Sequence, residues 1–234
     1  MRSNFRALCS GIGLILFAFS GAAVQASMQL NNVIFHFEPG EPARQDLEIF
    51  NPGDEPLYVE ITPTQVLAPG EVNEDRAIIR DPRAAGLLVT PNKLIVPPGT
   101  TKLVRLVKVG NSPVEKIYRI AAKPVVGELN AETSGVKVLI GYEVLAIIYP
   151  NNPQPELEVA REGRTLSVKN VGNSNVLLRE GFQCDTPELP REECTPLPGR
   201  RLYPGNEWRT ELPEDLPVTY YQSVGKRNFV KTYP

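Results

Sequence analysis

The apolar run at residues 136–150 most limits what this chain can fold into. As a strand it would extend roughly 40 Å at about 3.3 Å per residue, about twice the usual strand length. Because side chains alternate across a strand, one face would carry Val136, Val138, Ile140, Tyr142, Val144, Ala146 and Ile148. The opposite face would carry Leu139, Leu145 and Ile147. Such a strand must be covered on both faces, or it must lend part of its length to a partner.

The prolines of the chain indicate its fold class. There are 23 prolines among 234 residues, a density that disfavours long helices. Short apolar stretches alternate with turn sequences such as Asn51-Pro52-Gly53. The expected strands include residues 44–50, 57–62, 117–124, 165–170 and 218–224. Repeated short strands of this kind predict an all-β chain that forms two β-sandwiches.

The chain divides into a leader and two domains. Residues 1–26 have a basic start, an apolar core and a small-residue cleavage site before Ser27, as a cleaved signal peptide does. The alternative for this segment is a membrane anchor, although its apolar core is short for a span. Residues 150–155, with three prolines, cannot continue a sheet and form a stiff link. We therefore expect one domain at residues 27–150 and a second at residues 151–234.

Cysteine use fits an exported protein. Cys9 leaves with the leader, and Cys184 and Cys194 remain as an even pair for an oxidising compartment. A bridge between them would close a loop of about ten residues and contribute about 3 kcal/mol on the chain-entropy model. Two cysteines and one distant histidine do not make a four-ligand metal set, so we expect no metal and no cofactor.

Charge and motifs disfavour nucleic-acid binding and catalysis. The formal net charge of −2 gives no field that would attract nucleic acid. The single histidine, His36, lies in an apolar strand, where a structural role is the simpler interpretation. Trp208 is expected in the core or at the rim of the second sandwich. No nucleophile elbow, phosphate loop, zinc motif or dinucleotide fingerprint occurs, so the chain is predicted not to be an enzyme.

The order of several motifs resembles the periplasmic pilus-assembly chaperones. In the first half these motifs are residues 86–91, 97–99, 102–106, 117–119 and 136–150, with the turn at 51–53. In the second half they are residues 170–173 and 203–205. The Leu-Leu-Val-Thr-Pro segment at residues 87–91 and the cysteine pair are most similar to the alternate branch of the chaperone–usher pathway. The resemblance implies two immunoglobulin-like domains in an L-shaped, boomerang arrangement.

The resemblance also implies a function without a chemical reaction. A pilin subunit lacks its last strand, and the chaperone fills the open groove by donating a strand of its own. The donor residues here would be Val136, Val138, Ile140 and Tyr142. Each buried side chain would contribute roughly 1.5–3 kcal/mol. The chaperone would work in the periplasm and would pass the subunit to an outer-membrane usher.

The sequence departs from the family at the anchor for the subunit's C-terminal carboxylate. Well-studied members carry two basic residues in the interdomain cleft, one on the first strand and one near the end of the long strand. Residues 32–35 contain no lysine or arginine, and neither do residues 143–149. Candidate replacements are Arg105, Arg119 and Arg179, although Arg105 could instead form an ion pair on a strand surface or between the domains.

Three other interpretations stay open. The chain could be a secreted two-domain β-sandwich that binds a ligand or adheres to surfaces, which would explain the leader, the cysteine pair and the strands. That interpretation would not explain the long strand or the ordered motifs. A chaperone that caps its own binding strand by self-association would keep the family and alter only the resting state. A secreted hydrolase is the third alternative.

Overall fold

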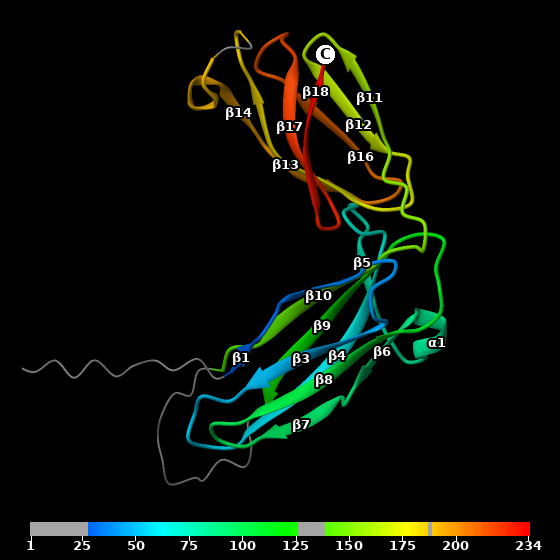
Figure 1. Ribbon diagram of the computed structural model, residues 1–234, viewed down its shortest axis with the longest axis vertical. Helices are drawn as coiled ribbons and strands as arrows, with labels where there is room; N and C mark the ends of the chain where they lie inside the picture. The colour runs from blue at the N-terminus through cyan, green and yellow to red at the C-terminus, as the bar shows by residue number, and fades with distance from the viewer. Residues whose placement is uncertain (1–27, 126–138, 187–188) are drawn as a thin grey trace, which may run out of the picture.

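The computed structural model describes residues 28–125, 139–186 and 189–234. The predicted signal peptide and the predicted donor residues Val136 and Val138 lie outside this part of the chain. Figure 1 shows two β-rich domains placed end to end and set at an angle. Helices in the described part are limited to α1 (Pro82–Ala85) and the 3-10 turn η1 (Arg191–Glu193), and neither could span a membrane. The prediction of an all-β chain with two sandwich domains is confirmed.

The first sandwich packs a smaller sheet against a larger one. The smaller sheet has the strand order β1 (Gln29–Leu30), β3 (Arg44–Phe50), β8 (Thr101–Lys108), β6 (Leu87–Thr90). The larger sheet has the order β2 (Ile34–Phe37), β10 (Tyr142–Ile148), β9 (Lys116–Val125), β4 (Leu57–Leu67), β5 (Asp75–Ile78), and β7 (Lys93–Val96) also pairs with β4. The first strand switches sheets, because β1 pairs with β3 whereas β2 pairs in parallel with β10.

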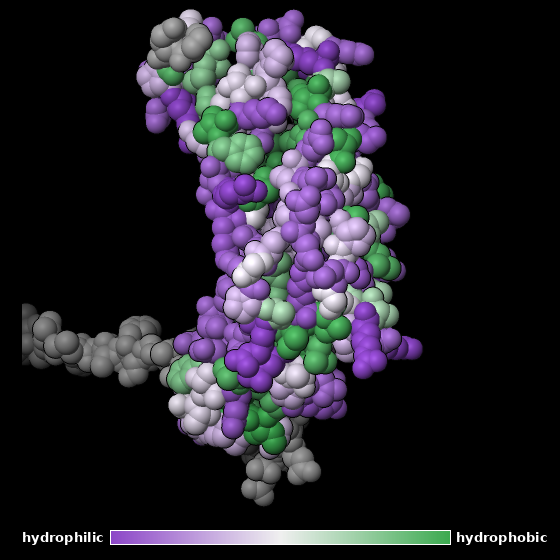
Figure 2. Space-filling view, turned by 45° about the vertical axis from the view of Figure 1, so that its right-hand side comes forward, coloured by the Kyte–Doolittle hydropathy of each residue, from purple (hydrophilic) through white to green (hydrophobic). Residues whose placement is uncertain are grey.

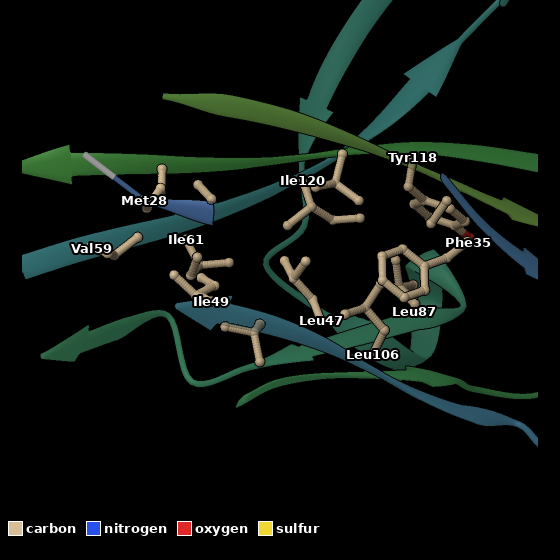
Figure 3. Packing of buried hydrophobic residues seen from close by; sticks show 14 of the residues in the cluster. Met28, Phe35, Leu47, Ile49, Val59, Ile61, Leu87, Leu106, Tyr118 and Ile120 are labelled. Atoms are coloured by element: carbon tan, nitrogen blue, oxygen red, sulfur yellow. The ribbon is translucent and has the colours of Figure 1, made fainter. Parts of the chain in front are cut away.

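Alternate residues from both sheets fill the core of the first sandwich. In β4 the buried face carries Leu57, Val59 and Ile61, as the alternation of the sequence predicts. Figure 3 shows side chains such as Leu47 and Ile120 meeting from the two facing sheets. Full burial of one such side chain contributes roughly 1.5–3 kcal/mol, so this core holds the sheets that position β10.

The second sandwich repeats this design with fewer strands. One sheet has the order β11 (Leu157–Glu162), β12 (Thr165–Asn170), β16 (Glu207–Glu211). The other has the order β14 (Thr195–Leu197), β13 (Val176–Gln183), β17 (Val218–Val224), β18 (Arg227–Tyr233), with β15 (Arg200–Leu202) also paired to β13. Trp208 packs against this core, with its ring centroid 6.2 Å from that of Tyr220, as expected.

A disulfide closes the loop between β13 and β14. Cys184 and Cys194 are bridged, ten residues apart in the sequence, which confirms the predicted pair. The bridge spans the 3-10 turn η1 and fixes a loop that has little regular structure of its own. Closing such a loop restricts the unfolded chain, which favours the folded state.

The same asparagine turn ends a strand in each sandwich. After β3, the buried Asn51 side chain donates to the carbonyls of Glu55 and Val96 at 2.8 and 2.9 Å. After β12, the buried Asn170 side chain donates to the carbonyls of Ser174 and Leu202 at 2.9 and 2.8 Å. An asparagine amide satisfies backbone groups that a turn leaves without partners, so both corners are rigid.

Strands β5 and β16 were not predicted from the sequence, and β4 runs further than expected. The charged, irregular sequence of residues 71–85 predicts a loop or a short helical turn, but β5 lies there, and all four of its residues are exposed. It forms because it pairs with the second half of β4, which continues to Leu67. β16 is polar apart from Trp208 and pairs with β12. An exposed edge strand needs no apolar alternation, so its sequence carries little signal.

Candidate partner-binding edge and interdomain cleft

Strand β10 is paired fully along one edge and only partly along the other. Its inner edge pairs antiparallel with β9, from Tyr142 opposite Ala122 to Ile148. Its outer edge pairs with β2 only from Leu145 onward. Within the described residues, no strand pairs with the outer edge of β10 between Tyr142 and Val144. The larger sheet therefore has an open strand edge at this point.

Backbone groups at this open edge point away from the sheet. The Leu145 N–H donates to the Val33 carbonyl at 2.9 Å, on the side of β10 away from β9. Backbone groups of a strand alternate in direction, so the N–H and carbonyl of Glu143 point to the same side as those of Leu145. An exposed row of such groups is a template to which another strand can be added.

Both faces of β10 are covered beyond the open edge, as the sequence requires of an apolar strand. Val144, Ala146 and Ile148 belong to the core of the first sandwich. On the opposite face Leu145 and Ile147 join a second apolar cluster with Val66, Ile117 and Tyr149, against which Tyr203 of the second sandwich packs. This end of β10 is thus held between the two domains, near the junction visible in Figure 1.

Within the described residues, the strand predicted to run from residue 136 begins at Tyr142, and its pairing with β9 ends there, opposite Ala122. Residues 139–141 are described and are not part of a strand. In the register of β9 and β10, Pro124 lies opposite Ile140. Proline has no N–H to donate, so it removes the ladder hydrogen bond at that position. Ile140 is 44% exposed, and this apolar side chain lies directly before the open edge.

Of the two predicted donor residues that the structure describes, Tyr142 packs against the chain's own core. Its side chain is half-buried against the first core, and its hydroxyl donates to the Met28 carbonyl at 3.3 Å. Of the four predicted donor residues, Ile140 and Tyr142 are described, and only Ile140 is largely exposed. The role of the four residues in binding a partner stays a prediction.

Glu143, the middle residue of the open edge, forms an ion pair. The Arg76 guanidinium of β5 lies 2.5 Å from the Glu143 carboxylate of β10, and both side chains are half-exposed. An exposed ion pair contributes little to stability, typically below about 1 kcal/mol. Strands β9 and β4 lie between β10 and β5, so this pair crosses a face of the larger sheet and does not run along its open edge.

Two of the three arginines proposed from the sequence lie away from the junction between the two domains. Arg105 lies on β8 in the smaller sheet, where its Nε donates to Asp46 at 3.0 Å. That contact is the strand-surface ion pair that the sequence left open as an alternative. Arg179 lies on β13 and lines a shallow pocket with Arg191 and Tyr221. The structure therefore does not bring Arg105 and Arg179 together with Arg119.

Arg119 lies beside the interdomain apolar cluster and has a counterpart in the second domain. Arg119 is in register with Leu145, so the two side chains share a face of the larger sheet. Arg201, on β15, shares a side of its strand with Tyr203 and donates to the Asn175 side-chain oxygen. Burial raises the pKa of Tyr203, while the charges of Arg201 and Arg119 lower it in part. The charges of one arginine from each domain thus act on Tyr203.

Sequence reasoning missed Arg201, for which the only available signal was its position next to a family-like turn. Arg201 comes directly before the Tyr203-Pro204-Gly205 turn that matches the chaperone family. The basic residues of well-studied members lie on the first strand and on the long strand. That pattern gives no reason to expect a basic residue beside a turn in the second domain.

A buried polar group lies at the same junction. The Glu115 side chain is 8% exposed, and its Oε2 accepts hydrogen bonds from the backbone N–H of Asn175 at 3.0 Å and from its side-chain amide at 2.6 Å. Burial raises the pKa of the Glu115 carboxyl to about 7, and the hydrogen bonds from Asn175 and the charge of Arg201 offset part of that rise. Nothing in the sequence around Glu115 distinguishes it from a surface glutamate.

His36 has a structural position, as expected. Its Nδ1 lies 3.3 Å from the Tyr149 hydroxyl, and the two rings stack with their centroids 6.0 Å apart. Burial lowers the pKa of His36. Burial has the opposite effect on the Tyr149 hydroxyl and raises its pKa to about 12. His36 therefore helps to hold the end of β10 against β2.

Two further contacts fix the angle between the domains. At the turn between β17 and β18, the Lys226 N–H donates to the Glu38 carboxylate at 3.1 Å, and the Lys226 ammonium pairs with Glu41. On another side, the Asn206 side-chain amide donates to Glu71 at 2.6 Å. Figure 2 shows that one face of the molecule is mostly hydrophilic over both domains, with small apolar areas between.

The chain is similar to fimbrial proteins in sequence and to fimbrial chaperones in structure. No protein-family model matches it. It is 25% identical over 173 residues to a CS1 fimbrial subunit of Escherichia coli, a match that covers 70% of this chain and 72% of that protein. The class 5 fimbriae chaperone CfaA superposes with a TM-score of 0.69 at 19% identity, covering 88% of this chain and 98% of CfaA.

A chaperone solved with a bound pilin shows the same architecture. The complex of the SafA pilin and the SafB chaperone from Salmonella enterica contains a chain that superposes with a TM-score of 0.59 at 15% identity. The match covers 91% of this chain and 99% of that chain. These likenesses confirm that the chain has the two-domain β-sandwich fold of the fimbrial chaperones, as its motifs predicted. The assignment to the alternate branch stays a prediction.

Proposed function

We propose that this protein is a periplasmic chaperone that binds fimbrial subunits by strand addition at the open edge of β10. The single observation that supports this proposal most strongly is the outer edge at Tyr142–Val144, which no described strand covers. The exposed apolar side chain of Ile140 lies at the start of this edge. Backbone hydrogen bonds would supply affinity, and alternate side chains would supply specificity.

The predicted donor segment would continue this edge away from the second domain. Val136, Val138 and Ile140 would fill the groove that a subunit leaves open when it lacks a strand. Tyr142 would keep its contact with the first core and mark the point where the donor segment leaves the sheet. Pro124 supports this division, because it has no N–H with which β9 could continue the pairing that ends at Tyr142 and Ala122.

Arg119 and Arg201 are the residues that we propose to hold the subunit's C-terminal carboxylate. Guanidinium groups bind carboxylates through charge-assisted and often bidentate hydrogen bonds. The charges of these two arginines, one from each domain, both act on Tyr203, whereas Arg105 is paired with Asp46. The anchor of the family would then be rebuilt from one residue of each domain.

The remaining steps follow from the chaperone proposal. Residues 1–26 would direct the chain to the periplasm and would be removed there. The bound subunit would pass to an outer-membrane usher, and no reaction or cofactor would be needed. The folds of CfaA and SafB support the chaperone role at the level of architecture.

Co-purification from periplasm tests the proposal. The protein would be expressed with and without a candidate pilin that is encoded beside it. The readouts are co-purification of the pilin and its resistance to added protease. The expected result is a one-to-one complex that protects the pilin. Absence of a complex with every neighbouring secreted subunit would instead favour a ligand-binding or adhesion protein. A dimer that dissociates when the pilin is added would identify a self-capped resting state.

A matched pair of substitutions tests the edge itself. Ile140→Asp places a charge at the start of the open edge, and we expect it to abolish capture of the pilin without unfolding the protein. Ile95→Asp is the control, because Ile95 is 53% exposed on β7, away from β10. Capture at the wild-type level by Ile140→Asp, or equal loss in both variants, would contradict strand addition at β10.

A further inference from the structure

The junction between the two sandwiches contains a carboxyl group with only half of its hydrogen-bonding capacity used. Oε2 of Glu115 accepts both hydrogen bonds from Asn175. The other oxygen, Oε1, is buried and accepts no hydrogen bond from any described residue. A buried charge with an unsatisfied oxygen is costly, whereas a neutral carboxyl at the same place costs far less.

The contacts around Glu115 join the two domains directly. Glu115 precedes β9 of the first sandwich, and its N–H donates to the Asn173 carbonyl at 2.9 Å. The Asn173 side-chain amide donates in return to the Pro113 carbonyl at 3.2 Å. Asn175, whose backbone and side-chain N–H groups donate to Glu115, precedes β13 of the second sandwich. Two loops are therefore held together by reciprocal hydrogen bonds, with the Glu115 carboxyl at their centre.

The charged and titratable groups that face Glu115 do not neutralise it. Arg201 is the nearest cation, but its guanidinium donates to the Asn175 side-chain oxygen and forms no ion pair with Glu115 among the described contacts. Tyr149 follows β10 and Tyr203 follows β15, and the charge of Glu115 contributes to raising the pKa of both hydroxyls. His36 lies beyond Tyr149. Arg201 thus reduces the cost of a charged Glu115 without removing it.

We propose that Glu115 is the positioning residue that locks the second sandwich onto the first, and that its proton controls the lock. With a neutral carboxyl the junction is closed and the angle between the domains is fixed. With a charged carboxylate the junction opens more often, because opening lets water reach the charge. This proposal concerns the free protein and does not depend on the proposed chaperone function.

The direction of the pH dependence follows from the pKa of Glu115. The ordinary pKa of 4.5 rises to about 7 in the closed junction, so the closed state holds its proton more tightly than the open state. The stabilisation of the closed junction is complete below pH 4.5 and is lost as the pH rises through 7. His36 acts in the opposite sense, since its lowered pKa weakens the closed state when the pH falls below its ordinary value of 6.5.

Amide hydrogen exchange of the full chain measures the lock. The readout is the Asn175 amide, which donates to Glu115, with rates corrected for intrinsic exchange at each pH. Between pH 5 and pH 8 we expect its protection to fall on the order of 50-fold, from the size of the pKa shift. The Ile120 amide in the first core is the internal reference. A carboxyl-carbon NMR titration of Glu115 gives its pKa directly and needs no variant.

Three variants separate Glu115 from its neighbours. Glu115→Gln keeps the shape without the charge, so its Asn175 protection should not fall between pH 5 and pH 8, and the titration of His36 should make it rise slightly with pH. Glu71→Gln is the matched control, because Glu71 also accepts from an asparagine across the junction but is exposed. It should keep the wild-type pH profile. His36→Gln removes the opposing titration and should steepen the fall.

Two results would overturn the proposal. One is a Glu115 carboxyl that titrates at its ordinary pKa in the folded protein. The other is an Asn175 amide whose corrected protection is the same at pH 5 and pH 8 while Glu115 titrates near 7. Because the NMR titration uses the wild-type chain, a Glu115→Gln variant that fails to fold would leave both results measurable.

Discussion

The C-terminal end of β10 and the segment around its N-terminal end belong to one apolar run of the sequence and have opposite surroundings. At the C-terminal end, Ile147 is fully buried, paired on both edges and covered by the second domain. At the N-terminal end, Glu143 is paired on one edge, and Ile140 is 44% exposed. Alternating apolar residues therefore specify burial without specifying the surface that provides it. One end is buried by its own chain, and the other is proposed to be buried by a partner.

Truncating a side chain at the buried end of β10 should have the largest effect on the free energy of unfolding. Ile147→Ala removes a fully buried side chain between the domains, so the free energy of unfolding should fall by about 2–5 kcal/mol. Urea denaturation measures this loss. Ile34→Ala is the control on the neighbouring strand β2, where the side chain is mostly solvent-facing and the loss should stay below about 0.5 kcal/mol. Equal losses in both variants would remove the contrast on which the comparison depends.

Truncation of the open end should affect binding and leave stability unchanged. Ile140→Ala should change the free energy of unfolding by less than about 0.5 kcal/mol. If the proposed function holds, its affinity for a fimbrial subunit should fall roughly 10- to 150-fold, as expected for about 1.5–3 kcal/mol of lost burial. Calorimetric titration with the subunit measures the affinity. A variant that loses stability and keeps its affinity would place Ile140 in the chain's own core.

Restoring a backbone donor on β9 should lengthen β10. Pro124→Thr supplies an N–H opposite Ile140, and one added hydrogen bond contributes about 0.5–1.5 kcal/mol. We expect the Cα chemical shifts of Ile140 and Gly141 to become those of a strand. Lys123→Thr is the control, since that position already has an N–H. Unchanged shifts in the Pro124→Thr variant would show that another feature ends the strand.

Removal of the Tyr149 hydroxyl should have the smallest effect. Tyr149→Phe keeps the ring that stacks on His36 and removes the 3.3 Å contact to Nδ1. A single long hydrogen bond of this kind should contribute about 0.5–1 kcal/mol, measured by urea denaturation. A loss above about 3 kcal/mol would mean that the hydroxyl, more than the packing of Ile147, holds this end of β10.

Much of the fold could be predicted because its pattern is local. The predicted strands at residues 44–50, 165–170 and 218–224 coincide with β3, β12 and β17. In β17 every second residue is buried, which is the alternation that a half-buried strand imposes on its sequence. The Cys184–Cys194 bridge was equally predictable, since two cysteines in an exported chain allow one pairing.

The candidate site was predicted only in part, because its limits depend on neighbouring strands. The apolar run indicated a strand but gave no sign that it would begin at Tyr142. That limit comes from Pro124, which is distant in the sequence and adjacent only after β9 and β10 pair. Likewise, Arg119 was a candidate from the sequence, whereas Arg201 acquires significance only where β15 meets the first domain.

The amino-acid sequence is enough to specify an all-β chain with two sandwiches, one disulfide and an unusually apolar strand before a proline-rich link. These features follow from composition and from alternation over a few residues, which act within each strand. The tertiary arrangement sets which edge of β10 stays open, which arginine charges act on Tyr203, and that Glu115 is buried with half of its carboxyl unsatisfied. Burial, pairing and charge environment are properties of surfaces brought together from distant parts of the chain, and no local pattern encodes them.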